Sequence, residues 1–341
     1  MRQHLNTLYV TKAGTWLQLD GETVAVTENG KTLLRVPLHN LEAIQTFGWD
    51  IGATPQLMAH CAEKGIHLAF CNPNGKLFCR VSGFSTHGNV LLRRQQYRLA
   101  DDAEKSLAIA REMVAAKILN ARTVVQRAAR DRADSVPMVK HYARELAQNV
   151  RDARAATSAE KLLGIEGAAA EMYFSLFPHL ITTKEFSFDS RNRRPPTDPV
   201  NALMSFHYAL LASDCKSALE AVGLDSAVGV YHKDRPGRPG LALDMMEEFR
   251  AVLADRATLT LLNRRQLSPS DFSQDEGGAI RLSDPARRTV LQAWQERKKE
   301  QILHPLLQEK VAVGMLPHLQ ARLLAQHIRG TLDAYPPMLW K

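Results

Sequence analysis

Hydrophobic and polar residues change their spacing once along the chain, near residue 90. Before that point, the run WLQLDGETVAVTENGKTLLRVPL (16–38) alternates apolar and polar positions, as strands with one buried face do. Asp20-Gly21 and Asn29-Gly30 interrupt this run, and both pairs are favoured in two-residue hairpin turns. The pattern therefore predicts strands joined by tight hairpins.

Two further runs, IHLAF (66–70) and GKLFCRVSG (75–83), are also predicted strands. Between them and the hairpins, TPQLMAHCAEKG (54–65) is a predicted short helix, which Thr54-Pro55 opens and Gly65 ends. The first part of the chain is therefore expected to be a small β domain carrying one helix.

From about Leu92 onward, apolar residues recur at intervals of three and four, which is the helical spacing. The longest such run is 104–132, and Asp198-Pro199 is typical of a helix N-cap and first turn. The stretches 183–199 and 268–285 are predicted loops, the second with a short hairpin. Further helices are predicted at about 139–152, 158–177, 199–222, 240–262, 284–302 and 305–329.

The length of 341 residues exceeds that of one typical core, so we expect two domains. We place the boundary where the spacing changes, with a β domain at 1–92 and an α-helical domain at 93–341. The predicted fold class is α+β.

Composition narrows the range of functions. The net charge of +8 and the pI near 9.4 favour a polyanionic partner, above all nucleic acid, although a charge that serves solubility alone is the alternative. No apolar run approaches the roughly 20 residues that span a bilayer, and the N-terminus has no apolar signal core. We therefore expect a cytoplasmic protein without a membrane partner. The cysteines form no CxxC pair and are expected to be buried, reduced thiols: Cys61, Cys71, Cys79 and Cys215.

The stretch YHKDRPGRPGLALDMMEEFR (231–250) places a histidine before a rigid turn and three carboxylates on the helix that follows. At about 100° per residue, Asp244, Glu247 and Glu248 share one face of an amphipathic helix. A solvated acidic face at a helix start is one interpretation. However, three like charges at this spacing repel one another unless a cation compensates, and the turn could bring His232 back over that face.

Glu166 is a second candidate, in KLLGIEGAAAEMYF (161–174), where small neighbours let a ligand or another backbone come close. The alternative is a tight helix crossing in which Glu166 pairs with an arginine. Carboxylates of Glu166 and Glu247 with the imidazole of His232 would make an oxygen-rich site for Mg²⁺ or Mn²⁺ rather than zinc. Such an ion serves phosphodiester chemistry.

Three blocks, HKDRPGRPGLALDMMEEFR (232–250), GIEGAAAEMYF (164–174) and DPVNALMSFHYALL (198–211), resemble the signatures of one family. It is the CRISPR-associated integrase of spacer acquisition, the larger of the two universal adaptation proteins. The first block is long and specific, and the others follow in the expected order and spacing. The resemblance covers essentially the whole chain, and LNTLYVTKAGTWLQLDGETVAV (5–26) is most similar to the I-C branch.

This resemblance implies a β-sandwich-like domain at 1–92 that forms the homodimer, followed by the helical catalytic domain. It implies Glu166, His232 and Glu247 as metal ligands, with Asp244 as an assisting carboxylate in catalysis. The implied function is antiviral defence: insertion of short foreign DNA into the CRISPR array by Mg²⁺- or Mn²⁺-dependent transesterification, with an associated endonuclease activity. The implied partners are double-stranded DNA, as prespacer and as CRISPR repeat, and the small ferredoxin-like adaptation protein.

The turn and a basic loop supply candidate DNA contacts. Arg235 and Arg238 would hold the scissile phosphate, or else pair with Asp244 or Glu248. A DNA clamp that orders on binding, or alternatively a solvated loop, is predicted for three further arginines: Arg191, Arg193 and Arg194.

Other interpretations stay open at this point. His207 and Tyr208 have apolar neighbours and are expected to be packing residues. The chain could also be a metal-dependent nuclease that acts on branched DNA in repair, or a DNA-binding scaffold without enzymatic activity. Strand transfer of a free 3′-OH end separates the integrase from the nuclease, and loss of activity on removing Glu166 or His232 separates both from the scaffold.

Overall fold

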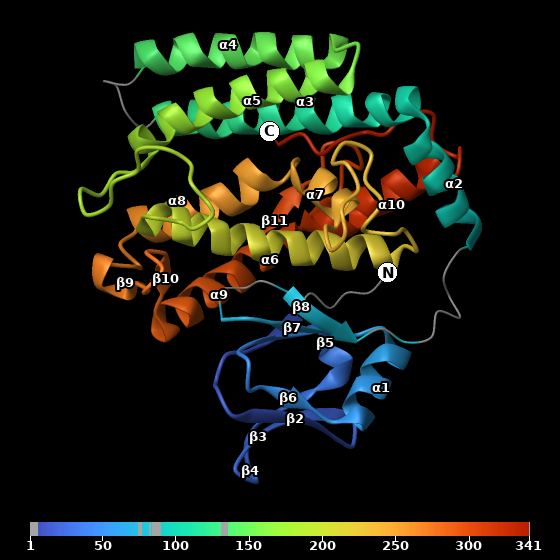
Figure 1. Ribbon diagram of the computed structural model, residues 1–341, viewed down its shortest axis with the longest axis vertical. Coiled ribbons are helices and arrows are strands. Elements are labelled where there is room, and N and C mark those ends of the chain that lie inside the picture. The colour runs from blue at the N-terminus through green and yellow to red at the C-terminus, as the bar shows by residue number, and fades with distance from the viewer. Residues whose placement is uncertain (1–5, 74–76, 82, 84–89, 131–135, 341) are drawn as a thin grey trace. The chain divides into compact units, whose positions relative to one another are not determined.

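The computed structural model describes residues 6–73, 77–81, 83, 90–130 and 136–340, with side chains of 128–130 and 136–140 left undescribed (Figure 1). The chain divides into two compact units. The first comprises 1–88, 283–300 and 313–315, and the second comprises 89–282, 301–312 and 316–341. The units thus alternate near the C-terminus, whereas the sequence suggested one crossing at 92/93; that simpler division stays a prediction.

The first unit contains two sheets of four described strands each. One has the order β1-β5-β7-β8, with bounds Asn6–Val10, Leu41–Phe47, His67–Cys71 and Leu77–Val81. The first three of these strands are parallel and β8 is antiparallel to β7. The other sheet has the order β4-β3-β2-β6, with bounds Lys31–Pro37, Thr23–Glu28, Thr15–Asp20 and Gly52–Ala53.

Local sequence explains the elements of this unit. Gly21, Asn29 and Gly30 all have positive φ and turn the chain between β2, β3 and β4, as the hairpin prediction requires. Helix α1 (Pro55–Lys64) begins at the Thr54 cap and ends at Gly65, which is left-handed. Side chains from both sheets and from α1 form one apolar core, including Leu17, Val24, Ile44, Leu57 and Leu68. Helix α9 (Asp284–Lys299) and the 3-10 turn η6 (Val313–Met315) also belong to this unit.

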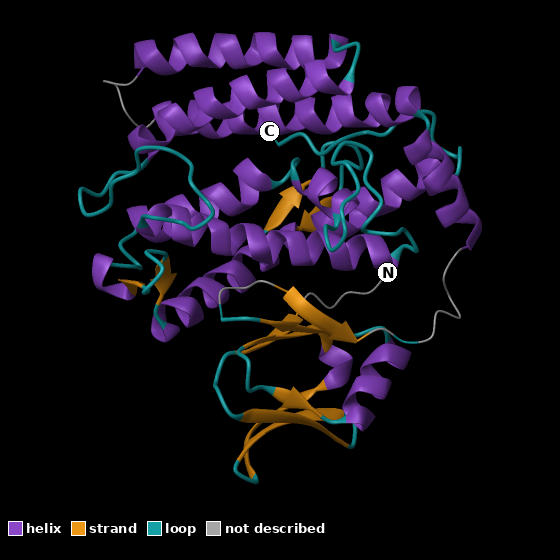
Figure 2. Cartoon of the chain, viewed as in Figure 1, coloured by secondary structure: helices purple, strands orange, loops and turns teal. Residues whose placement is uncertain are grey.

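The second unit is mainly helical, with two short hairpins, β9–β10 and β11–β12 (Figure 2). Helices α3, α4 and α5 pack side by side, and α6 packs against α7 and α10 (Figure 1). The helices are α2 (Val90–Asp101), α3 (Ala103–Arg130), α4 (Val136–Ala155), α5 (Ala159–Leu176), α6 (Pro199–Ala221), α7 (Gly240–Met246), α8 (Arg256–Asn263) and α10 (Leu316–Ile328). A π-helical turn, η4 (Arg250–Asp255), joins α7 to α8. The hairpin strands are β9 (Phe272–Gln274), β10 (Ile280–Leu282), β11 (Gln301–Leu303) and β12 (Lys310–Ala312), and the remaining 3-10 turns are η1 (Leu38–Asn40), η3 (Phe177–Leu180) and η5 (Pro269–Asp271).

The predicted α+β class is confirmed, with a β-rich part followed by a mostly helical one. Among the described residues no helix combines the length and the apolar character that a membrane crossing needs. Two details of the sequence prediction were wrong. The helix expected at 305–329 begins only at Leu316, because the β11–β12 hairpin takes the preceding residues and Pro305 restricts the residue before it. Cys79 is exposed on β8, although the other three cysteines are buried and all four are free.

Candidate active site

The turn that follows α6 is wrapped around one buried carboxylate. Asp244, on α7, has no exposed surface. Its Oδ2 accepts hydrogen bonds from the backbone N–H groups of Val230 (2.7 Å) and Tyr231 (3.0 Å), and its Oδ1 accepts from the N–H of His232 (2.8 Å). Gly229 packs so closely that a Cβ there would lie 2.8 Å from Asp244 Oδ2. The glycine and the carboxylate together fix the path of 229–232.

The same carboxylate orients the imidazole of His232. Nδ1 of His232 lies 2.6 Å from Oδ1 of Asp244. Because an ionised carboxylate can only accept, Nδ1 is the ring nitrogen that donates, and in the neutral ring the lone pair is then on Nε2. A carboxylate that holds the far nitrogen of a histidine is the usual support for a metal-ligating imidazole. Asp244 therefore acts on His232 and leaves Nε2 for chemistry.

Glu166 and Glu247 converge on a lysine from a third helix. Nζ of Lys117, on α3, pairs with Oε1 of Glu166 and lies 2.8 Å from Oε2 of Glu247. Oε2 of Glu247 is a buried acceptor, and the ammonium of Lys117 is the cation that pairs with it. Carboxylates that are distant in sequence thus share one cation position, as the metal hypothesis requires, but the cation there is an ammonium.

The three carboxylates after the turn point to three different places and do not form a solvated face. The interpretation as a solvated face is wrong because α7 and the residues that follow it up to Phe249 are almost entirely buried, so each carboxylate meets a different part of the protein. Glu248 has no exposed surface and accepts from the hydroxyl of Tyr335, 2.5 Å away, and from the N–H of Met338 at 2.6 Å. Asp244 faces the 230–232 backbone, and Glu247 faces α3 and α5.

Cations compensate the buried charge of Glu247, which is only 4% exposed. Burial alone would raise the pKa of this carboxyl, but the charges of Arg250 (2.9 Å) and Lys117 outweigh burial and hold the pKa below its usual value. Tyr231 lies in the same field: burial first, and then the negative charges of Glu166 and Glu247, raise the pKa of its hydroxyl. That hydroxyl has no hydrogen-bond partner among the described residues.

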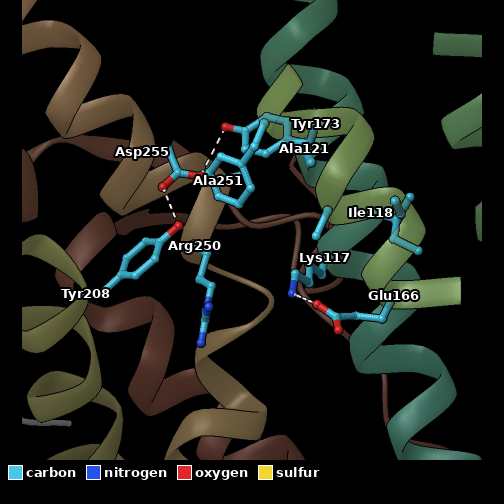
Figure 3. Close-up of a pocket in the computed structure, with 12 residues that line it drawn as sticks. Lys117, Ile118, Ala121, Glu166, Tyr173, Tyr208, Arg250, Ala251 and Asp255 are labelled. Carbon is cyan, nitrogen blue, oxygen red and sulfur yellow. Dashed lines mark hydrogen bonds and ion pairs between the residues drawn. The ribbon is translucent and has the colours of Figure 1, made fainter. Parts of the chain in front are cut away.

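A small cavity of about 40 Å³ opens beside these groups, between α3, α5, α6 and η4 (Figure 3). Asp255 stands on one side of it and accepts hydrogen bonds from Tyr173 (3.0 Å) and Tyr208 (2.7 Å). Burial raises the pKa of Asp255 to about 6. The guanidinium of Arg250 lies over the Tyr208 ring, 4.9 Å from its centre. Tyr208 thus lines the site, whereas we expected a packing residue.

His207, the neighbour of Tyr208, is a core residue as predicted. It is fully buried on α6, its Nδ1 is 2.9 Å from Oγ1 of Thr258, and burial lowers its pKa to about 3. It therefore stays neutral and takes no part in the site.

The predicted DNA-contact arginines lie in two loops. Arg235 is exposed and Arg238 half-buried, and both line an open cavity of about 510 Å³ together with Lys216. Their suggested partners, Asp244 and Glu248, are bound by the other groups described above. In the second loop, Arg193 and Arg194 are exposed.

Arg191, in that same loop, is held by the protein. One guanidinium nitrogen donates to Asn201 Oδ1 at 2.6 Å and the other to Ser205 Oγ at 3.0 Å. The guanidinium also lies 5.3 Å from the centre of the Tyr208 ring. Its part in DNA binding stays a prediction, and the structure gives it a clear local role in fixing the loop to α6.

The donor set fits a divalent cation, although the ion's place is taken by an amine. Among the described residues, no group of three or more His, Cys, Asp or Glu side chains stands close enough to hold a metal ion. Yet Glu166 and Glu247 already meet, and the unsatisfied Oε2 of Glu247 points at the shared cation. The flank of Glu166 is open, because a Cβ on Gly164 or Gly167 would meet nothing within 4 Å.

Comparison with known proteins decides the family. The model of the family described as CRISPR associated protein Cas1 matches residues 8–296. The chain belongs to the Cas1 family. The resemblance deduced from the three sequence blocks is thereby confirmed, whereas the I-C branch stays a prediction.

Relatives and solved Cas1 structures agree with this. Two proteins named CRISPR-associated endonuclease Cas1 are 46% identical (Chlorobaculum tepidum) and 48% identical (Rhodospirillum rubrum), each over 100% of both chains. In fold, the chain resembles a CAS1 protein from Thermotoga maritima (TM-score 0.83, 24% identity, 97% of this chain and 99% of that one). It also resembles a casposase bound to integration product (TM-score 0.84, 20% identity, 98% and 94%). At these identities the two structures speak for the fold alone.

In this Cas1 chain, sequence reasoning missed Lys117, Arg250 and the Tyr173–Asp255 pair. Lys117 sits in AAKIL, where helical spacing gives no sign that a charge faces inward. Arg250 closes the signature block, and its position three residues after Glu247 was the available signal, since residues at that spacing face one another on a helix.

Proposed function

We propose that this chain is a CRISPR adaptation integrase that inserts short DNA into the CRISPR array by metal-dependent transesterification and has an associated endonuclease activity. The observation that carries the proposal is the convergence of Glu166 and Glu247 on one cation position, with the imidazole of His232 held in a fixed orientation by Asp244. The family, and relatives named endonucleases at 46% and 48% identity, support it.

Glu166, Glu247 and Nε2 of His232 would hold Mg²⁺ or Mn²⁺. When bound, the ion supplies charge for the phosphate oxygens and for the departing hydroxyl. The chain's own groups supply orientation: Asp244 holds the imidazole by Nδ1, and Arg250 holds Glu247 through a 2.9 Å ion pair. Because Nε2 is the one ring atom left available, His232 serves either as ligand or as proton shuttle, and not as both at once.

DNA and a second protein would be the partners. The exposed arginines at 193, 194 and 235 lie on loops of the same unit as the site and would bind phosphates of the prespacer or of the repeat. One solved structure that resembles this chain is titled a Cas6-RT-Cas1--Cas2 complex (TM-score 0.82, 24% identity, 98% of this chain and 36% of that one). We propose that this chain likewise forms a homodimer and binds the small ferredoxin-like adaptation protein.

A strand-transfer assay tests the proposal. A labelled duplex with free 3′-OH ends is incubated with a plasmid bearing a CRISPR repeat, the smaller adaptation protein and Mn²⁺. Joined product is expected for the wild type. Glu166→Gln and His232→Ala should each lower the rate by about 10²–10⁴-fold, because each removes a ligand of the ion that would stabilise charge at the reacting phosphate.

Glu171→Gln is the matched control, because Glu171 is an exposed carboxylate on the same helix α5. It should join ends at the wild-type rate. Cleavage without joining would favour the repair nuclease instead. Unchanged joining and cleavage in Glu166→Gln and His232→Ala would leave a scaffold role.

A further inference from the structure

Lys117 reaches the site from within a buried stretch of α3. Its neighbours Ala115, Ala116 and Ile118 are at most 2% exposed, and the lysine side chain itself is 16% exposed. Its partners are the carboxylates of Glu166 and Glu247, the same two that would bind the metal.

The ammonium holds together two groups that would otherwise repel each other. Glu166 comes from α5 and Glu247 from the turn after α7, so no local backbone geometry ties them to one another. Arg250 forms its ion pair with Glu247 at the other oxygen, Oε1, and Glu166 acts on Arg250 through charge alone. Lys117 is thus the group that bridges the two carboxylates.

We propose that Lys117 is an internal counter-ion that occupies the cation position of the Glu166–Glu247 pair until a divalent ion displaces its ammonium. The proposal rests on the proposed metal-dependent function and adds to it an internal cation that competes with the ion. In the metal-free protein the ammonium of Lys117 neutralises both carboxylates and fills the position between them. When the ion binds, the amine leaves Oε1 of Glu166 and Oε2 of Glu247 and turns away along the open flank of α5.

Displacement has a measurable cost in affinity. The divalent ion can bind only while the ammonium is out of the site. The apparent Kd for the ion is therefore the intrinsic Kd divided by the fraction of time that the site is free. If the amine is absent about one time in ten, removing it lowers the apparent Kd about tenfold. A permanent structural ion pair predicts the reverse, since loss of the lysine would then misplace the ligands and weaken binding.

The first experiment measures Mn²⁺ binding to the full chain by electron paramagnetic resonance of free Mn²⁺. Lys117→Met should bind about tenfold more tightly than the wild type and melt at a lower temperature without metal. Lys105→Met is the matched control, because Lys105 lies on the same helix, is 69% exposed and pairs only with Asp102. It should leave the Kd unchanged. An unchanged or weaker Kd in Lys117→Met overturns the proposal.

A second experiment uses the wild type alone, so it does not depend on the folding of the variant. Amine acylation followed by mass spectrometry should leave Lys117 protected without metal and label it at saturating Mg²⁺, while Lys105 is labelled equally in both. Equal labelling of Lys117 in both conditions refutes displacement. If neither protein binds Mn²⁺, the metal-dependent function fails together with the proposal; if the wild type binds and Lys117→Met binds no tighter, the proposal fails alone.

Discussion

Replacing Asp244 by asparagine keeps the shape of the side chain and exchanges one acceptor oxygen for an NH₂ group. Each carboxylate oxygen receives two donors: Oδ1 from the N–H and Nδ1 of His232, and Oδ2 from the N–H groups of Val230 and Tyr231. The least costly orientation turns the NH₂ toward His232, whose ring can move its proton to Nε2 and accept at Nδ1. Asp244→Asn then leaves one part-buried donor, the backbone N–H of His232, without an acceptor.

The magnitude follows from that count. A donor without a partner costs about 1–3 kcal/mol, so the free energy of unfolding should fall by about 1–3 kcal/mol. Domains of this kind are stable by only about 5–15 kcal/mol, so the loss is measurable against the total. For a unit of this size the melting temperature should fall by roughly 2–12 °C.

Urea denaturation followed by far-UV circular dichroism measures this loss, because most helices belong to the second unit. Asp234→Asn is the control, since Asp234 is an exposed carboxylate in the same turn, and it should change the stability by less than about 0.5 kcal/mol. If Asp244→Asn were as stable as Asp234→Asn, the idea that this carboxylate holds the turn would be refuted.

Two further predictions concern packing and protonation. Gly229→Ala should lower the free energy of unfolding, because its Cβ would lie 2.7 Å from the His232 carbonyl oxygen. Gly167→Ala meets open space and should stabilise α5 by up to about 1 kcal/mol. Equal effects of the two substitutions in urea denaturation would contradict this reasoning. Burial raises the pKa of Asp255 from 3.8 to about 6, so the native state holds this proton more tightly than the unfolded chain does. The free energy of unfolding should therefore fall by about 3 kcal/mol as pH rises from about 4 to 6. Asp255→Asn should lose that slope, and a slope unchanged from wild type would show that Asp255 is not its source.

The sequence predicted the framework of the site well, because its signals are local. Hairpin pairs such as Asn29-Gly30 and caps such as Asp198 act through a few neighbouring atoms, and the structure has them as expected. The charge argument also succeeded: three carboxylates in one short stretch demanded cations, and Arg250 and Lys117 provide them for Glu247.

The sequence could not show in which direction the side chains of the site point. Asp244, Glu247 and Glu248 are all buried and each meets a different neighbour, and no residue type announces which neighbour that is. Lys117 pairs with Glu166 because α3 packs against α5. These segments are distant in the sequence, so local patterns do not reveal the contact. The ligand set Glu166, His232 and Glu247 accordingly stays a prediction that came from the resemblance and that the carboxylate convergence supports.

The buried hydrogen bonds to Glu248 join residues that are synthesised at different times. The carboxylate next to Glu247 is held by Tyr335 and Met338, and Asn120 of α3 accepts from the N–H of Trp340. Residue 340 is synthesised 93 positions after residue 247 (340 minus 247). At the usual pace of translation this is a delay of roughly 5–20 s. A growing chain therefore carries Glu248 without these hydrogen-bond partners for that time, and the core around it is completed only when synthesis nears its end.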